Sequence, residues 1–225
     1  MNPRDTVRRP NRFAARLAAM GAGIALVACC AMLLVPGIAA AGIFSASGPD
    51  DGYAGNPPDN NNCTGCHDSY PVNSGAGSVQ LLNLPSAFVP GNTYDLLVRL
   101  SDPDPLRMKW GFELTVLDAA AQQAGELVAL DAIETQVSDN GGTQPDYIKH
   151  TYDGTHDSAP SPSTWPIRWI APNLPSVTFY LAGNAANWSD DPSGDYIYTT
   201  SAYLAQAATG TENTSWGKIK ALYTP

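Results

Sequence analysis

The stretch MKWGFELTV at residues 108–116 places a large apolar side chain at every second position. Alternation with period two, sustained over more than five residues, predicts a half-buried β-strand with one face in a core. A helix would need apolar residues spaced three and four apart, and that pattern is scarce elsewhere in the chain. The stretch therefore sets the expectation of a β-protein.

The same alternation returns on both sides of this stretch, between segments rich in turn residues. The chain holds 20 glycines and 19 prolines, which favours many short strands over long helices. The further alternating runs cover residues 78–81, 94–100, 165–169, 177–181 and 196–200. About eight such runs predict an all-β fold, an antiparallel β-sandwich, over residues 77–206.

The first 41 residues differ in composition from the rest. Five arginines precede an apolar run at residues 17–38, and small residues follow at 39–41. This order predicts a secretory signal peptide cleaved after Ala41. An uncleaved membrane anchor and a lipoprotein attached through Cys29 are the alternatives. We therefore expect an exported protein in the periplasm, at the outer cell surface or outside the cell, touching a membrane only through this segment.

Removal of residues 1–41 would leave a strongly acidic protein. The whole chain carries a net charge of −9, and the segment holds five arginines and one aspartate. The remaining chain would carry about −13, which disfavours nucleic acid and anionic lipid as partners. A basic redox protein or another cytochrome, attracted by this charge, is the expected partner.

Residues 42–76 have little that could build a core and are predicted to form an irregular segment. The segment contains the pentapeptide CTGCH at residues 63–67. In Cys-x-x-Cys-His the two thiols form thioether bonds with the vinyl groups of haem, and the histidine binds the iron. The pentapeptide therefore predicts one covalent haem c, attached through Cys63 and Cys66, with His67 as the proximal axial ligand.

Other chemistries of a Cys-x-x-Cys pair remain open. A redox-active dithiol usually opens a helix in a βαβ unit, and the alternation indicates no such unit. A zinc site would need a second pair of cysteines to complete its four ligands. A small structural disulfide between Cys63 and Cys66 is the main alternative to haem.

A second axial ligand could come from only three side chains after residue 41. His150 ranks first because it shares parity with Ile148 and so faces inward at a strand end. His156 lies in a loop, where exposure to solvent is expected. Met108 shares parity with Trp110, which makes core packing its expected role. An iron without a second protein ligand is a further alternative.

The loop that contains Asp190, Asp191 and Asp195 is a weak candidate for a calcium site. Carboxylate oxygens in a loop are ligands that Ca²⁺ prefers. The sequence DPSGD at residues 191–195 is equally typical of a turn. No Ser-His-Asp or paired-carboxylate arrangement can be assigned, so an electron carrier or binding module is favoured over an enzyme.

A set of short stretches carries a family resemblance. These stretches are CTGCH (63–67), LP (84–85), PGNTY (90–94), WGFELT (110–115), YIKHT (147–151), GT (154–155), TFY (178–180), GNAAN (183–187) and GDYIYTT (194–200). Together they resemble the exported bacterial choice-of-anchor V domain proteins, which are similar to the Reeler β-sandwich. The resemblance covers about residues 48–206. It implies an immunoglobulin-like sandwich with a haem-bearing N-terminal segment, at the cell surface or in the periplasm, and it favours His150 over Met108.

Three functions are compatible with these features. The first is an extracytoplasmic monohaem cytochrome that passes single electrons. The second is a cell-surface structural or adhesive module in which the haem, or a disulfide of the cysteine pair, is structural. The third is a haem enzyme or gas sensor, which needs an open sixth position on the iron.

Residues 207–225 are predicted to form a polar spacer followed by a short tail. Residues 216–223, WGKIKALY, could form an amphipathic helical tail with Trp216, Ile219 and Tyr223 on one side. The tail is either a docking or sorting tag or a cover for the end of a strand.

Overall fold

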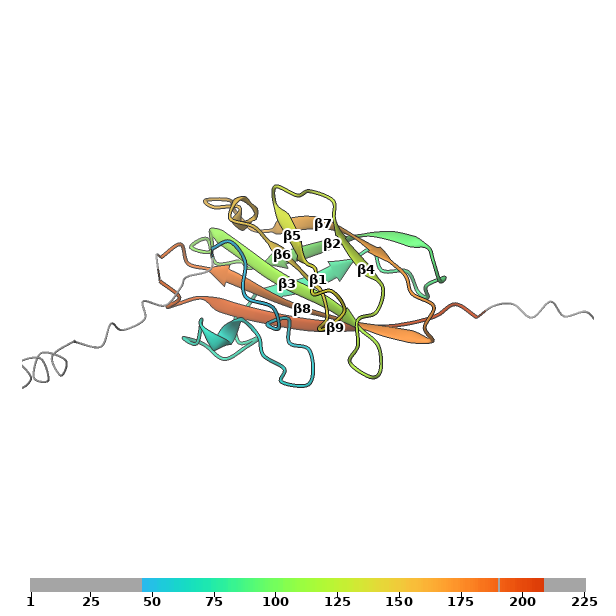
Figure 1. Cartoon of the computed structure of the whole chain (residues 1–225). Helices are drawn as coiled ribbons and strands as arrows, with labels where there is room; N and C mark the ends of the chain where they lie inside the picture. The colour runs from blue at the N-terminus through green and yellow to red at the C-terminus, as the bar shows by residue number, and fades with distance from the viewer. Residues whose placement is uncertain (1–45, 190, 209–225) are drawn as a thin grey trace, which may run out of the picture. The chain divides into compact units, whose positions relative to one another are not determined.

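The structure is a computed structural model that describes residues 46–189 and 191–208 (Figure 1). The predicted signal peptide, Asp190 and the predicted C-terminal tail lie outside the described residues. Within the described part of the chain, no helix is long and apolar enough to cross a membrane.

In these described residues, nine strands form two antiparallel sheets packed face to face (Figure 1). The four-stranded sheet has the order β1 (Ser78–Leu82), β2 (Thr93–Ser101), β7 (Ser163–Ile170), β4 (Glu126–Ala129). The five-stranded sheet has the order β5 (Thr135–Ser138), β6 (Tyr147–His150), β3 (Lys109–Leu117), β8 (Ser176–Ala186), β9 (Tyr196–Ala205). The prediction of an antiparallel β-sandwich is confirmed.

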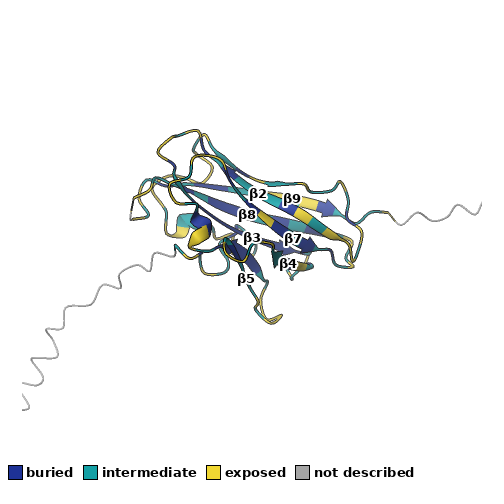
Figure 2. Cartoon of the chain, turned by 90° about the horizontal axis from the view of Figure 1, so that it is seen from above, coloured by how far each residue is buried: buried dark blue, intermediate teal, exposed yellow. Residues whose placement is uncertain are grey.

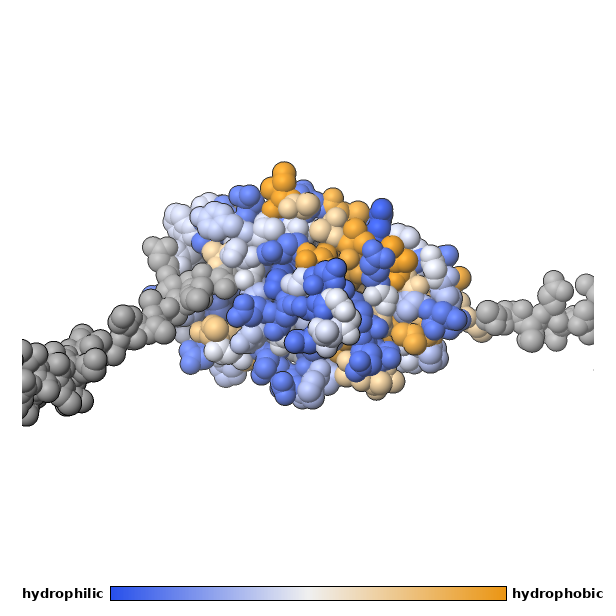
Figure 3. Space-filling view, in the orientation of Figure 1, coloured by the Kyte–Doolittle hydropathy of each residue, from blue (hydrophilic) through white to orange (hydrophobic). Residues whose placement is uncertain are grey.

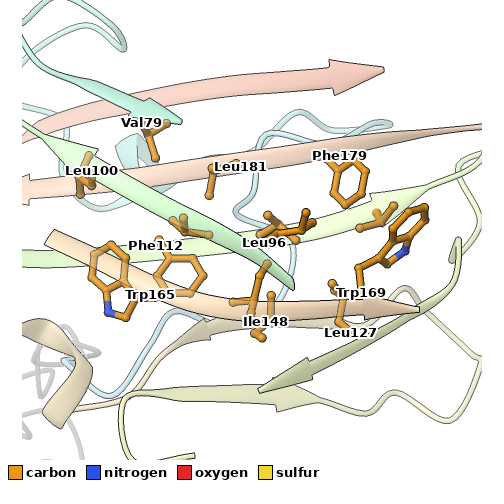
Figure 4. Close-up of a cluster of buried hydrophobic side chains, with 14 of the residues drawn as sticks. Val79, Leu96, Leu100, Phe112, Leu127, Ile148, Trp165, Trp169, Phe179 and Leu181 are labelled. Atoms are coloured by element: carbon orange, nitrogen blue, oxygen red, sulfur yellow. The ribbon is translucent and has the colours of Figure 1, made fainter. Parts of the chain in front are cut away.

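The core lies between the two sheets and is built from the alternating residues of both (Figure 4). Phe112 of β3 packs against Trp165 of β7, with ring centroids 4.7 Å apart. Trp169 makes edge-to-face contacts with Phe88 and Phe179. Each such side chain contributes about 1.5–3 kcal/mol by leaving water. The period-two pattern therefore selects the residues that hold the sheets together.

One strand boundary differs from the sequence expectation. Strand β3 begins at Lys109, so Met108 precedes it and is only half-buried. Its neighbour Arg107 is buried instead, with its guanidinium 4.6 Å from the ring of Tyr196. Met108 lines an open cavity of about 570 Å³ beside Arg107 and does not belong to the hydrophobic core.

The outer face of β3 is covered rather than open to solvent. Residues 46–76 run across β3 and β8 on the side away from the core (Figure 1). Glu113 and Thr115, which alternate with the core residues, are 0% exposed. Every residue of β3 after Lys109 is buried, and Figure 2 shows this strand in dark blue. The expectation of a half-buried strand is therefore wrong for β3, because the N-terminal segment forms an additional layer.

Candidate functional site

The pentapeptide CTGCH folds as a single tight turn. Residues Cys63–Gly65 form the 3-10 helix η1, capped by Asn62, whose Oδ1 accepts a hydrogen bond from Thr64 N at 3.0 Å. The amides of Cys66 and His67 both donate to Cys63 O, at 3.2 and 2.9 Å. The turn thus brings two thiols and one imidazole within five residues. Both cysteines are free thiols, and Cys66 is exposed while Cys63 is partly buried.

The imidazole of His67 is fixed by a carboxylate from a distant part of the chain. Its Nδ1 lies 2.6 Å from Oδ2 of Asp195, which is 2% exposed and directly precedes β9. The other oxygen of Asp195 accepts a hydrogen bond from Asn187 N at 3.0 Å. A proton on Nδ1 of His67 leaves the Nε2 lone pair available for a metal. Metal-binding histidines commonly have such a carboxylate on the second nitrogen.

Asn184 of β8 lies on the other side of the imidazole. Its Nδ2 is 3.2 Å from His67 Nδ1, 3.3 Å from His67 Nε2 and 3.4 Å from Oδ2 of Asp195. Its Oδ1 is buried and has no hydrogen-bond partner in the part of the chain that the structure describes. Asn184 pairs in register with Gly111 of β3, so the site stands on the outer face of the five-stranded sheet.

His150, expected as a distal ligand, is buried against β3. Its Nδ1 lies 3.0 Å from Phe112 N and 3.1 Å from Phe112 O. Burial lowers the pKa of His150 to about 4, so the ring is neutral near pH 7. A Cβ at Gly111 would stand 2.7 Å from the His150 ring, which explains the glycine there. Among the contacts of the described residues, none joins His150 to His67.

The two weaker axial candidates lie among other partners. His156 stacks on Trp165 with ring centroids 5.0 Å apart, and its Nδ1 is 2.9 Å from Ser163 Oγ. Its side chain is 18% exposed, less than expected for a loop, because of this stacking. Met108 lines the cavity beside Arg107. Neither side chain contacts the pentapeptide in the described structure.

Two of the three aspartates considered for calcium have other polar contacts, and the third lies outside the described residues. Asp195 faces His67, and Asp191 accepts hydrogen bonds from Ser193 N and Oγ, which lower the pKa of Asp191. Asp190 is not among the described residues. Within residues 46–189 and 191–208, no group of three or more His, Cys, Asp or Glu side chains could hold a metal ion.

A cluster beneath the pentapeptide was not expected from the sequence. Glu113 receives a hydrogen bond from Tyr53 N at 2.5 Å on Oε2, while its buried Oε1 has no partner. Desolvation raises the pKa of Glu113 to about 8. Lys149 donates to Asp51 Oδ1 at 2.7 Å and to Pro49 O at 2.6 Å. In the sequence, Glu113 occupies a polar position of a strongly alternating strand, and such a position normally indicates a face exposed to solvent. The pattern therefore did not predict this buried cluster.

The residues of the pentapeptide fit the donor set of a haem c. Among the described residues the two thiols are unbonded, and the adjacent imidazole has its Nδ1 at 2.6 Å from a buried carboxylate and its Nε2 at 3.3 Å from Asn184 Nδ2. Cys66 is exposed and the His67 side chain is 28% exposed, so a group bound there would reach the surface. These are properties of the chain's own residues.

No family model matches this chain, and no curated protein matches its sequence. Among solved structures, it is similar to the reeler domain of human F-spondin at 19% identity and a TM-score of 0.40, over 58% of this chain and 89% of that one. A Reelin-N domain of F-spondin gives 19% and 0.43, over 63% and 94%. A cohesin module from Clostridium perfringens gives 9% and 0.39, over 59% and 98%. The β-sandwich assignment rests on the strand pairing itself.

Proposed function

We propose that this β-sandwich module carries one haem c on its N-terminal segment and passes single electrons outside the cytoplasm. Cys63 and Cys66 would hold the haem through thioether bonds, and Nε2 of His67 would bind its iron. When bound, the haem supplies a one-electron couple at the iron.

The observation that carries this proposal is the contact between His67 and Asp195. Fixing Nδ1 of the imidazole at 2.6 Å selects the tautomer with the proton on Nδ1 and a lone pair on Nε2, and it restrains rotation of the ring. The iron would replace the present contact of Nε2 with Asn184 Nδ2, which is 3.3 Å long. Asp195 itself is held by Asn187 N, so the carboxylate is fixed before any ligand arrives. A histidine that served only as a surface residue would not need a buried carboxylate partner.

The surroundings of the pentapeptide suit exchange of electrons with a protein partner. Cys66 and His67 lie at the surface, and the face shown in Figure 3 is largely hydrophilic. The excess of acidic residues would attract a basic partner and speed the encounter. Export, which the N-terminal sequence predicts, would place the protein where c-type haem is attached.

His150 stays the first candidate for the second axial ligand. Phe112 O, 3.1 Å from His150 Nδ1, can accept a proton held there, and that tautomer leaves Nε2 free. Phe112 N favours the opposite tautomer, so ligation would require breaking one backbone contact. His150→Ala should change the visible spectrum of the loaded protein if the ligation occurs.

The test is production in a host that matures c-type cytochromes, followed by a pyridine haemochrome assay and intact mass. We expect one haem per chain, and none on the double variant Cys63→Ser, Cys66→Ser. Asp195→Asn should keep the attached mass but shift the reduction potential, because the asparagine cannot share the imidazole proton. A colourless parent protein with the apo mass would refute the proposal.

A structural or adhesive surface module is the second candidate, and the β-sandwich by itself favours it. Asp51, Tyr53 and Asn56 dock the N-terminal segment on the sheet without using the cysteines. A module of this kind would keep its fold and binding when both cysteines are replaced. Voltammetry of the haem-loaded protein distinguishes the electron carrier from the structural module. An electron carrier exchanges electrons reversibly with the electrode, whereas a purely structural haem need not.

A further inference from the structure

The two thiols of the pentapeptide have different environments. Both belong to the N-terminal segment, but Cys66 is exposed, whereas Cys63 is partly buried near Glu113 of β3. An alkylating reagent must reach the sulfur atom, so this difference in access disfavours reaction at Cys63.

This environment exists only while the N-terminal segment is docked. Asp51 of the segment accepts hydrogen bonds from Lys149 Nζ at 2.7 Å, Ser138 Oγ at 2.7 Å and Asn140 Nδ2 at 2.8 Å. The Lys149 and Asp51 side chains are 10% and 20% exposed. A fourth hydrogen bond, from Asn56 Nδ2 to Tyr147 OH at 3.0 Å, is buried. These contacts hold the segment on β5, β6 and the loop between them.

We propose that the docked N-terminal segment protects Cys63, so that Cys66 reacts first and Cys63 reacts only when the segment leaves the sheet. Thiol addition to a vinyl group forms a carbon–sulfur bond and moves the thiol hydrogen to the neighbouring carbon, so no oxidant is consumed. Haem attachment at both thiols would therefore precede docking. Only this consequence for haem rests on the proposed function; the difference between the thiols does not.

The test measures alkylation of the full chain, prepared without haem, by iodoacetamide. The variant Cys66→Ser leaves only the Cys63 thiol in the folded domain, and Cys63→Ser leaves only Cys66. We expect the Cys66 thiol to be labelled at least about tenfold faster than the Cys63 thiol. The labelling rates are measured by mass spectrometry of the peptide that contains residues 63–67. Equal rates in the folded protein would overturn the proposal.

Variants that weaken docking make the test specific. Asp51→Asn and Lys149→Met should each speed labelling of Cys63 several-fold and leave Cys66 unchanged. Lys109→Met is the matched control, because Lys109 pairs with Asp157 at 3.7 Å and makes no hydrogen bond or ion pair with the described residues of the segment. Asp51 belongs to the segment and not to a strand, so Asp51→Asn keeps the test valid if Lys149→Met does not fold. A Cys63 rate unchanged in Asp51→Asn would overturn the proposal.

A haem measurement separates this inference from the proposed function. In a cytochrome-maturing host, Asp51→Asn should carry both thioether bonds in at least as large a fraction of chains as the parent, judged by intact mass. If the parent never acquires haem but Cys63 is protected and released as described, the proposed function fails and the protection stands. If haem is attached but the two thiols react equally fast, the protection fails and the proposed function stands.

Discussion

The side chains on the two faces of β3 are equally buried, but different parts of the molecule cover them. On the inner face, Phe112 and Leu114 lie at 1% and 0% exposure among aromatic and aliphatic side chains of both sheets. On the outer face, Glu113 lies at 0% exposure under an irregular segment that contacts it through a backbone amide. Apolar packing is tolerant of pH, whereas a buried carboxyl is not. The exposed fraction of a side chain therefore does not indicate whether apolar packing or polar contacts cover it.

The largest effect should come from the inner face. Phe112→Ala would remove a buried ring that packs on Trp165 and should lower the free energy of unfolding by about 3–5 kcal/mol. Urea denaturation followed by tryptophan fluorescence would measure it. Tyr203→Ala, at a side chain 69% exposed, is the control. Equal losses in both variants would contradict this description of the core.

A smaller and more local effect should come from the outer face. Lys149→Met removes the donor to Asp51 and Pro49 O and should lower stability by about 1–3 kcal/mol. The loss should be concentrated in the segment, so amide hydrogen exchange at residues 49–56 should rise more than in β8. Uniform exchange across both regions would show that the segment and the sandwich unfold as one unit.

The outer face should also depend on pH. Burial raises the pKa of Glu113 to about 8 from 4.5, so the folded protein keeps a proton that the unfolded chain has lost. Stability should therefore fall as pH rises from about 4.5 to about 8. Glu113→Gln should flatten this slope. Thermal unfolding of the parent and of Glu113→Gln between pH 5 and pH 8.5 would measure the contribution of Glu113, because any contribution of His150 is common to both proteins. Parallel stability profiles of the two proteins would contradict this prediction.

The smallest effect should come from a charge pair outside both buried layers. Arg168 donates to Asp95 through Nε at 2.7 Å and through a terminal nitrogen at 3.0 Å, and both side chains are exposed. Solvent screens such pairs strongly, so Arg168→Ala should leave the melting temperature unchanged within error. A clear shift would indicate that the outer surface of the four-stranded sheet has a partner layer of its own.

Much of the fold could be predicted from the sequence, but the site only in part. Alternation identified β3 and the core residues, because each side chain's face depends only on parity along its own strand. The error at Met108 arose at a strand end, where alternation gives no signal for the last paired residue. The sequence identified Asp195 as a loop carboxylate but not its contact with His67. Aspartate is common both in turns and among metal ligands, so its presence in a loop does not indicate its partner.

The sequence by itself determined that Cys63, Cys66 and His67 lie near one another, because five consecutive residues span at most about 18 Å even when fully extended. Only the tertiary structure decided that Asp195, 128 residues from His67, meets its imidazole. It likewise decided that Glu113 lies beneath residues 46–76 rather than in water. Local spacing follows from covalent geometry, whereas polar contacts between distant segments depend on how sheets and loops pack, and no periodicity encodes them.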